Sequence, residues 1–221
     1  MKDLSKTIKM KRFFCIFTAL AVFAGSMKAD EGMWLLPLLQ KMNSKAMKEM
    51  GCDLNPKQIY NGNGSSLKDA IVQFGGGCTG EVISGEGLLV TNHHCGYSNI
   101  QKLSSVEHDY LKDGYWAMNR SEELPCEGLT VTFLEYMKEI TPVMDKAEKA
   151  ARKQYKDSVN VDIEKAVGKA VDAAVEKLVK ETEEKNPYCE VVVENFYNHN
   201  KYYIIVYKTY KDIRFVGAPP S

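Results

Sequence analysis

The pattern between residues 78 and 95 places the tightest limit on how this chain folds. Two short β-like runs, residues 81–84 and 88–91, flank the turn Gly85-Glu86-Gly87, which is typical of an antiparallel hairpin. Cys78 precedes the first run, and the dipeptide His94-Cys95 follows soon after the second, with His93 before it. The sequence therefore predicts a hairpin that delivers two histidines and a cysteine at the end of an apolar strand.

The remaining pattern predicts a mainly β chain with a helical insertion, hence an α+β fold. Apolar residues at helical spacing predict an N-terminal helix over residues 33–50. Residues 143–187 are rich in Ala, Lys, Glu and Val, and their apolar positions recur every three or four residues. They predict an amphipathic helix or helix pair that ends at Asn186-Pro187. Outside this insertion, further β-like runs cover residues 70–74, 128–136, 190–196 and 202–210.

The first 29 residues are typical of an export signal. A basic region precedes an unbroken apolar run over residues 13–24, which is too short to span a bilayer as a helix. Cleavage is expected after Ser26 or after Ala29, which leaves residues 30–221 as the mature chain. We therefore expect no stable membrane span, and a membrane anchor is the alternative interpretation of the same run.

The charge distribution argues against a nucleic-acid partner. The whole chain carries 29 Lys+Arg and 29 Asp+Glu, but six of the basic residues and one acidic residue fall within residues 1–29. The mature chain keeps 23 basic and 28 acidic residues. It has no clustered basic face of the kind that nucleic-acid binding requires.

Export permits disulfides, and Cys15 is expected to be removed with the leader. The five cysteines that remain are an odd number, so one thiol lacks a partner within the chain. Cys126 and Cys189 flank the helical insertion, and a bridge between them is one expectation. Cys52 is expected to be buried and free.

A zinc site built from Cys78, His93, His94 and Cys95 is a competing interpretation. Adjacent residues rarely converge on one metal, and no C-x-x-C spacing supports tetrahedral closure. We expect neither a metal nor a cofactor. His108 and His199 are expected at the surface, and Trp34 and Trp116 in the core.

Several stretches together resemble the bacterial dipeptidyl-peptidase 7 and 11 family of chymotrypsin-clan serine exopeptidases. The resemblance covers about Asp30 to Ser221 and is carried by residues 65–81, 91–97, 122–125 and 210–221. The hairpin followed by His-Cys is also similar to the first barrel of chymotrypsin-like peptidases. In that barrel, the cysteine after the general-base histidine is bridged to one upstream.

The resemblance implies an incomplete first chymotrypsin-like β-barrel, preceded by the N-terminal helix, within a trypsin-like peptidase domain. It implies that Cys78 is bridged to Cys95 and that His94 is the catalytic general base, with His93 a packed or hydrogen-bonded neighbour. Taken without the family, a histidine pair at a strand end is more often structural than catalytic. The Asp and Ser of the triad would lie beyond residue 221. The intact parent is then an enzyme, and this polypeptide alone is expected to be inactive.

The family releases dipeptides from peptides with a free N-terminus, in the periplasm or at the cell surface of Gram-negative bacteria. The resemblance therefore implies peptide substrates and leaves a homodimer of the full-length protein open. It does not decide between apolar and acidic residues at the second substrate position. A hypothesis of a different class is a secreted, non-catalytic binding module that kept the barrel and lost the chemistry.

Overall fold

The computed structural model describes residues 34–220, so the expected export signal over residues 1–29 lies outside the described residues. The unit Leu36–Ser221 holds the sheet and the helices that the structure describes. Within residues 34–220, no helix combines the length and the apolar character that a bilayer span requires.

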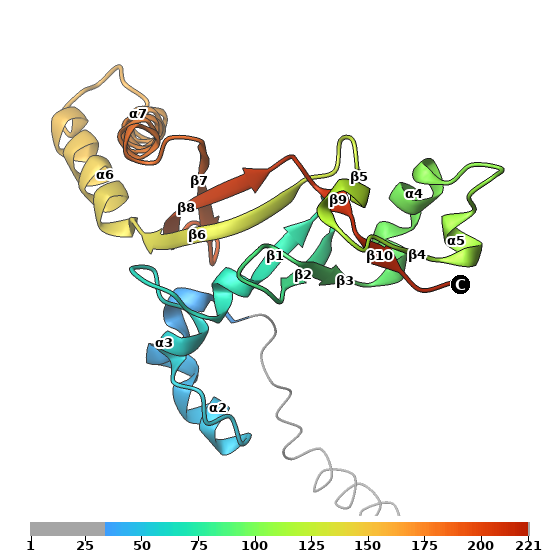
Figure 1. Cartoon of the computed structure of the whole chain (residues 1–221). Coiled ribbons are helices and arrows are strands. Elements are labelled where there is room, and N and C mark those ends of the chain that lie inside the picture. The colour runs from blue at the N-terminus through green and yellow to red at the C-terminus, as the bar shows by residue number, and fades with distance from the viewer. Residues whose placement is uncertain (1–33, 221) are drawn as a thin grey trace, which may run out of the picture. The chain divides into compact units, whose positions relative to one another are not determined.

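A six-stranded antiparallel sheet organises this unit (Figure 1), with the strand order β3-β2-β1-β6-β8-β7. β6 and β8 pair along most of their length, with a bulge between Leu134 and Tyr136. β3 and β7 each have one neighbour in the sheet and form its two edges. The strands are β1 Ile71–Phe74, β2 Cys78–Val82, β3 Leu89–Thr91, β6 Val131–Glu139, β7 Cys189–Phe196 and β8 Lys201–Tyr210.

Two short ladders join the last part of the chain to the segment that precedes β6. β4 (Tyr115–Trp116) pairs with β10 (Gly217–Ala218), and β5 (Leu124–Pro125) pairs with β9 (Arg214–Phe215). Residues 214–218 therefore return to residues 115–125 after the sheet is complete.

Helical segments precede and follow the hairpin. The N-terminal helix predicted over residues 33–50 falls where the structure has three consecutive pieces: the 3-10 helix η1 (Leu36–Leu38), the π-helix η2 (Leu39–Asn43) and α2 (Ser44–Glu49). Pro37, which has no amide hydrogen to donate, lies in the first piece. The shorter helices are α3 Pro56–Ile59, η3 Leu67–Ala70, α5 Tyr110–Asp113 and η4 Arg120–Glu122.

Two helices occupy the range of the predicted insertion, namely α6 (Thr141–Tyr155) and α7 (Ile163–Lys185). Asp162 caps α7 by accepting a hydrogen bond from the amide of Lys165, as is usual at helix N-termini. Arg152 of α6 makes ion pairs with Glu148 and with Glu164 of α7. The apolar stripe of α7 packs on the sheet beside Val191, Ile204 and Val206.

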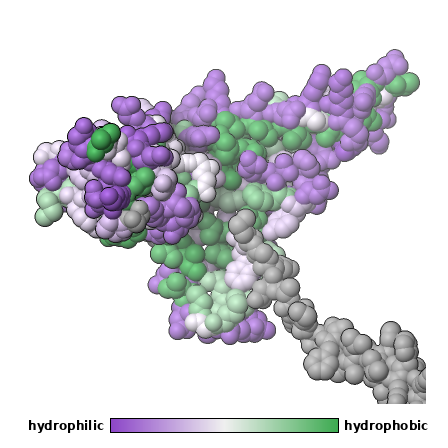
Figure 2. Space-filling model, turned by 90° about the vertical axis from the view of Figure 1, so that its right-hand side faces the viewer, coloured by the Kyte–Doolittle hydropathy of each residue, from purple (hydrophilic) through white to green (hydrophobic). Residues whose placement is uncertain are grey.

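A second apolar cluster lies beneath the hairpin, at the other end of the sheet. Its buried members are Val72, Phe74, Cys126, Leu129 and Val131. The alternation along β1 directs Val72 and Phe74 inward and leaves Ile71 and Gln73 exposed, as a half-buried strand requires. Burying each of these side chains contributes about 1.5–3 kcal/mol. Apolar surface also reaches solvent: Figure 2 shows it in the middle of one face, bordered by hydrophilic side chains.

Three sequence expectations are wrong. Cys126 and Cys189 are both free thiols, because Cys126 packs in the cluster beneath the hairpin and Cys189 against the cluster under α7. Cys52 is free but only half-buried. Trp116 is not a core residue, since 65% of it is exposed; it lies on the two-residue strand β4, outside the six-stranded sheet.

Candidate functional site

A disulfide links Cys78, the first residue of β2, to Cys95 in the first turn of α4 (His93–Leu103). The sulfur atoms are 2.13 Å apart, and the Cα separation of 6.0 Å lies in the usual range for a disulfide. The predicted bridge is confirmed. It ties the helix that begins with the two histidines to the strand pair that precedes it.

The β2–β3 hairpin sets the direction in which the chain enters α4. Gly80 pairs with Thr91, and the hydroxyl of Thr91 donates to the carbonyl oxygen of Thr79 at 2.6 Å. A Cβ at position 80 would lie 2.9 Å from the end of the Leu89 side chain, so a larger residue there would make Leu89 shift. In the turn, the Ser84 hydroxyl accepts from the amide of Leu88 at 3.0 Å.

His93 and His94 lie in the first turn of a helix rather than on the end of a strand. Asn92 is extended and occupies the N-cap position of α4, and the amide of Cys95 donates to its carbonyl oxygen at 2.9 Å. Both histidines are exposed. His93, expected as a packed or hydrogen-bonded neighbour, packs edge-on against Tyr97, with the ring centroids 5.9 Å apart, although its side chain is exposed.

The imidazole of His94 lies beside the disulfide. One of its nitrogens and the sulfur atoms of Cys78 and Cys95 are all within 4.8 Å of one another. Zinc would require thiolate ligands, but the two sulfurs are covalently joined. An exposed imidazole held on a fixed turn can accept a proton from a hydroxyl that approaches it and return it to a leaving group.

The other two histidines are exposed, as predicted. His108 stacks on Tyr110, with the ring centroids 6.0 Å apart, and His199 lies in the β7–β8 turn. The structure places neither of them in a cluster with His94. Only the hairpin and α4 bring sequence-predicted site residues together.

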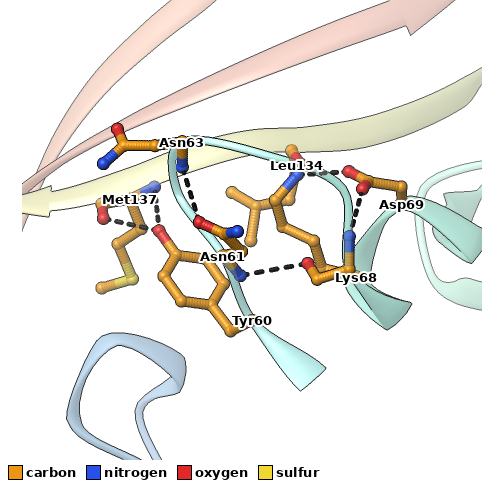
Figure 3. A network of polar contacts seen from close by, with 8 residues as sticks. Tyr60, Asn61, Asn63, Lys68, Asp69, Leu134 and Met137 are labelled. Atoms are coloured by element: carbon orange, nitrogen blue, oxygen red, sulfur yellow. Dashed lines mark hydrogen bonds and ion pairs between the residues drawn. The ribbon is translucent and has the colours of Figure 1, made fainter. Parts of the chain in front are cut away.

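A polar network that no sequence pattern indicates supports β6 from residues 60–69 (Figure 3). The Tyr60 hydroxyl bonds to the backbone of Met137, and the Lys68 ammonium donates to Asp69 and, at 3.3 Å, to the carbonyl oxygen of Leu134. The Lys68 side chain is only 7% exposed. No periodicity or spacing marks such residues, because their partners are backbone atoms far away in the sequence.

Charge pairing in this network affects the ionisation of Asp69. Burial acts to raise the pKa of its carboxyl group, but hydrogen bonds from Lys68 and from the amide of Ser66 outweigh burial and hold the pKa below its ordinary value. The ionised carboxylate also closes a capping box on η3 by accepting from the Ser66 amide at 2.8 Å. The loop is thereby fixed against β6.

Comparison with known proteins gives consistent matches. A sequence profile of the peptidase S46 family matches residues 29–221. The dipeptidyl-peptidase 7 of Capnocytophaga gingivalis is 43% identical over 214 residues, 96% of this chain. The Asp/Glu-specific dipeptidyl-peptidase of Porphyromonas gingivalis is 44% identical over 193 residues, 87% of this chain.

A solved structure agrees with these matches. The crystal structure of Porphyromonas endodontalis DPP11 in complex with the dipeptide Arg-Glu superposes with a TM-score of 0.67 at 38% identity, covering 87% of this chain. The present chain spans 27% of that protein's chain, 28% of the Capnocytophaga relative and 26% of the Porphyromonas gingivalis relative.

Proposed function

Because the chain belongs to the peptidase S46 family, we propose that it is the N-terminal part of an exported serine-type dipeptidyl-peptidase with His94 as the general base. The observation that carries the proposal is the placement of His94, exposed in the first turn of α4 and directly before the disulfide-bonded Cys95. Such a turn can present an imidazole to a substrate without moving. The substrates would be peptides with a free N-terminus.

In the proposed mechanism, His94 makes a serine hydroxyl nucleophilic. A hydroxyl is a poor nucleophile at neutral pH unless a neighbouring base removes its proton. His94 would take that proton during attack on the peptide carbonyl and give it to the departing amine, while an aspartate holds the imidazole in one tautomer. The serine and the aspartate would come after residue 221 in the complete protein. The disulfide contributes by limiting movement of the turn that carries the base.

The proposal extends to architecture and location. The strands beneath the hairpin would form part of a first chymotrypsin-like barrel, with α6 and α7 as a helical insertion. Residues 1–29 would direct export to the periplasm or the cell surface, and a homodimer of the complete protein stays an open alternative to a monomer. The superposition on DPP11 supports a shared fold with that peptidase, and the basic, then apolar, leader supports export.

The test is an assay of the complete gene product on fluorogenic dipeptidyl amides. The panel should pair an apolar with an acidic second residue, because this chain matches an Asp/Glu-specific dipeptidyl-peptidase and a dipeptidyl-peptidase 7, whose name carries no such specificity, almost equally. Each substrate is also made with an acetylated N-terminus. We expect turnover of the free-amine substrates, none of the acetylated ones, and none by the 221-residue chain assayed in parallel. A complete protein that binds these peptides without cleaving them would instead establish the non-catalytic binding module.

A further inference from the structure

We infer that residues 213–220 form a latch that closes on residues 114–126, and that Gly114 is a positioning residue for the proposed active site, since no side chain fits there while the latch is closed. The positioning role rests on the proposed function, whereas the latch itself does not. The evidence for the latch is a set of backbone contacts between two segments that lie far apart in the sequence.

Backbone hydrogen bonds hold the latch along its length. At its start, the amide of Cys126 donates to the carbonyl oxygen of Ile213 at 2.8 Å. The β5–β9 and β4–β10 ladders come next. Between them, the amide of Ala117 donates to the carbonyl oxygen of Val216 at 2.9 Å. The latch is therefore held at several points and does not depend on one contact.

Gly114 lies against the end of the latch. A Cβ at this position would be 2.8 Å from the backbone nitrogen of Pro220 and 2.9 Å from the carbonyl oxygen of Ala218. These are backbone atoms, which cannot rotate out of the way as a side chain can. Gly114 also has φ of +75°, a conformation that glycine adopts readily. Any other residue would have to push Ala218 and Pro220 away.

Gly217 is a second glycine of the latch region with a close neighbour, but here the neighbour is mainly a side chain that can move. A Cβ there would be 2.5 Å from the Trp116 ring. The indole is 65% exposed, so it can swing toward solvent and relieve part of the overlap. The tryptophan that the sequence placed in the core instead covers the latch at its β10 strand.

The latch and the helix that carries His94 are anchored to the same apolar cluster. Ile213 and Phe215 of the latch pack against it, and so do Cys95 and Leu103 of α4. Aromatic rings add a second connection: Phe215 stacks on Tyr115 with centroids 5.4 Å apart, and Tyr115 contacts Tyr110 at 4.8 Å.

Tyr110 in turn is joined to the end of α4. Its amide donates to the hydroxyl of Ser104, the residue that caps α4, at 3.1 Å. The latch, the aromatic rings and α4 therefore form one contiguous packed region. The chain that leaves residue 220 starts from a place that is fixed relative to α4. Under the proposed function, this fixed starting point sets the position of the aspartate and serine, which would complete the active site, with respect to His94.

The direct test measures hydrogen exchange in the complete protein, with and without a side chain at position 114. Gly114→Ala should speed exchange in peptides covering residues 114–118 and 213–220 by about tenfold, because opening the latch breaks the bond from Ala117 to Val216. The matched control is Gly128→Ala: Gly128 has φ of +78°, and nothing lies within 4 Å of its added Cβ. Exchange that is no faster in Gly114→Ala than in Gly128→Ala would overturn the inference.

A second pair of variants keeps the test decisive if Gly114→Ala does not fold. Gly217→Ala should speed exchange in the same peptides, and its effect should be smaller in a Trp116→Ala background, where the ring is gone and only the Tyr115 carbonyl oxygen, 3.1 Å from the added Cβ, remains close. An equal effect of Gly217→Ala with and without the indole would contradict the proposed contact and, with it, the latch.

Kinetics of the complete enzyme test the positioning role. Gly114→Ala should lower kcat by about a hundredfold with little change in KM. It should also shift the low-pH limb of the kcat profile, which reports the general base, because the aspartate that orients His94 in the proposed mechanism would be displaced. Gly128→Ala should leave kcat and the pH profile unchanged. Unaltered kcat in a Gly114→Ala enzyme whose latch exchanges faster would reject the positioning role. A wild-type protein without turnover would instead reject the proposed function, and the exchange experiment would still decide the latch.

Discussion

The hydroxyl of Tyr60 makes two hydrogen bonds with the backbone of Met137, donating to its carbonyl oxygen and accepting from its amide, each at 2.7 Å. β1 pairs with β6 only at Val131–Phe133, so Met137 lies beyond the end of β1. The phenol therefore satisfies two backbone groups that a longer β1 would otherwise have paired. Burial raises the pKa of Tyr60, so the hydroxyl keeps the proton that it donates.

Tyr60→Phe should therefore destabilise the chain although it changes one atom. It leaves the half-buried amide and carbonyl of Met137 without partners, which costs about 1–3 kcal/mol. Urea denaturation followed by circular dichroism measures the loss. Tyr188→Phe is the matched control, because Tyr188 is 95% exposed, and it should change the free energy of unfolding by less than about 0.5 kcal/mol. Equal effects of the two substitutions would show that the Met137 contact contributes nothing.

His94→Ala and His93→Ala in the complete enzyme separate the base from its neighbour. His94→Ala should lower kcat by roughly three or more orders of magnitude, because only residual catalysis survives the loss of a triad member. His93→Ala should leave kcat within a few fold. Both residues are exposed, so each variant should keep its free energy of unfolding within about 0.5 kcal/mol. An inactive His93→Ala with an active His94→Ala would show that His93, and not His94, is the general base. Full activity in both variants would contradict the peptidase proposal.

Removing the disulfide should affect both stability and turnover. Cys78→Ser combined with Cys95→Ser should lower the free energy of unfolding by about 2–4 kcal/mol, measured without reductant. In the complete enzyme, kcat should fall as the turn that carries His94 gains freedom. Cys52→Ser, at a free and half-buried thiol, is the control and should cost less. A disulfide-free enzyme with wild-type kcat would mean that β2 and β3 alone fix α4.

The ion pair between Glu139 and Lys201 predicts a specific pH dependence. A hydrogen bond from the Lys201 ammonium lowers the pKa of Glu139. This stabilisation is complete above the pKa of a free glutamate, about 4.3, and is lost as the pH falls through the lower folded-state value. Lys201→Met should reduce Tm at pH 7, and the deficit should shrink between about pH 4.5 and pH 3.

The expected size of this effect is small, about 0.5 kcal/mol, because both side chains are partly exposed. Lys177→Met is the control, since the ammonium of Lys177 lies 3.8 Å from Glu181 on the open face of α7. Its Tm difference from the wild type should vary less with pH. A Lys201→Met deficit that stays constant down to pH 3 would show that packing of the lysine stem, and not charge, is responsible.

Local features could be predicted from the sequence, and non-local ones could not. The turn at residues 85–87 and the periodicity of residues 143–187 depend on neighbours in the chain, and both fall where the structure has a hairpin and two helices. The pairing of Cys78 with Cys95 came from the family resemblance. The failures were residues whose surroundings come from distant segments: the thiols of Cys126 and Cys189, and the indole of Trp116.

The site shows the same division. The His94-Cys95 dipeptide could be recognised because its residues are adjacent. The helical conformation of His93 and its exposure depend instead on where α4 begins after its N-cap residue Asn92. Gly114 carried no sequence signal, because its neighbours Ala218 and Pro220 arrive from the other end of the chain.

The position of β6 in the sheet has a consequence for how the chain folds. β6 lies between β1, which precedes it, and β8, which comes only after the whole of α6, α7 and β7. One side of β6 therefore stays unpaired until almost all of the described chain is available, and loop closure over such a distance is slow. During that interval the exposed edge can pair with another chain. A protein with this topology should refold in higher yield at low concentration, and the β6–β8 ladder should be the last part of the sheet to become protected.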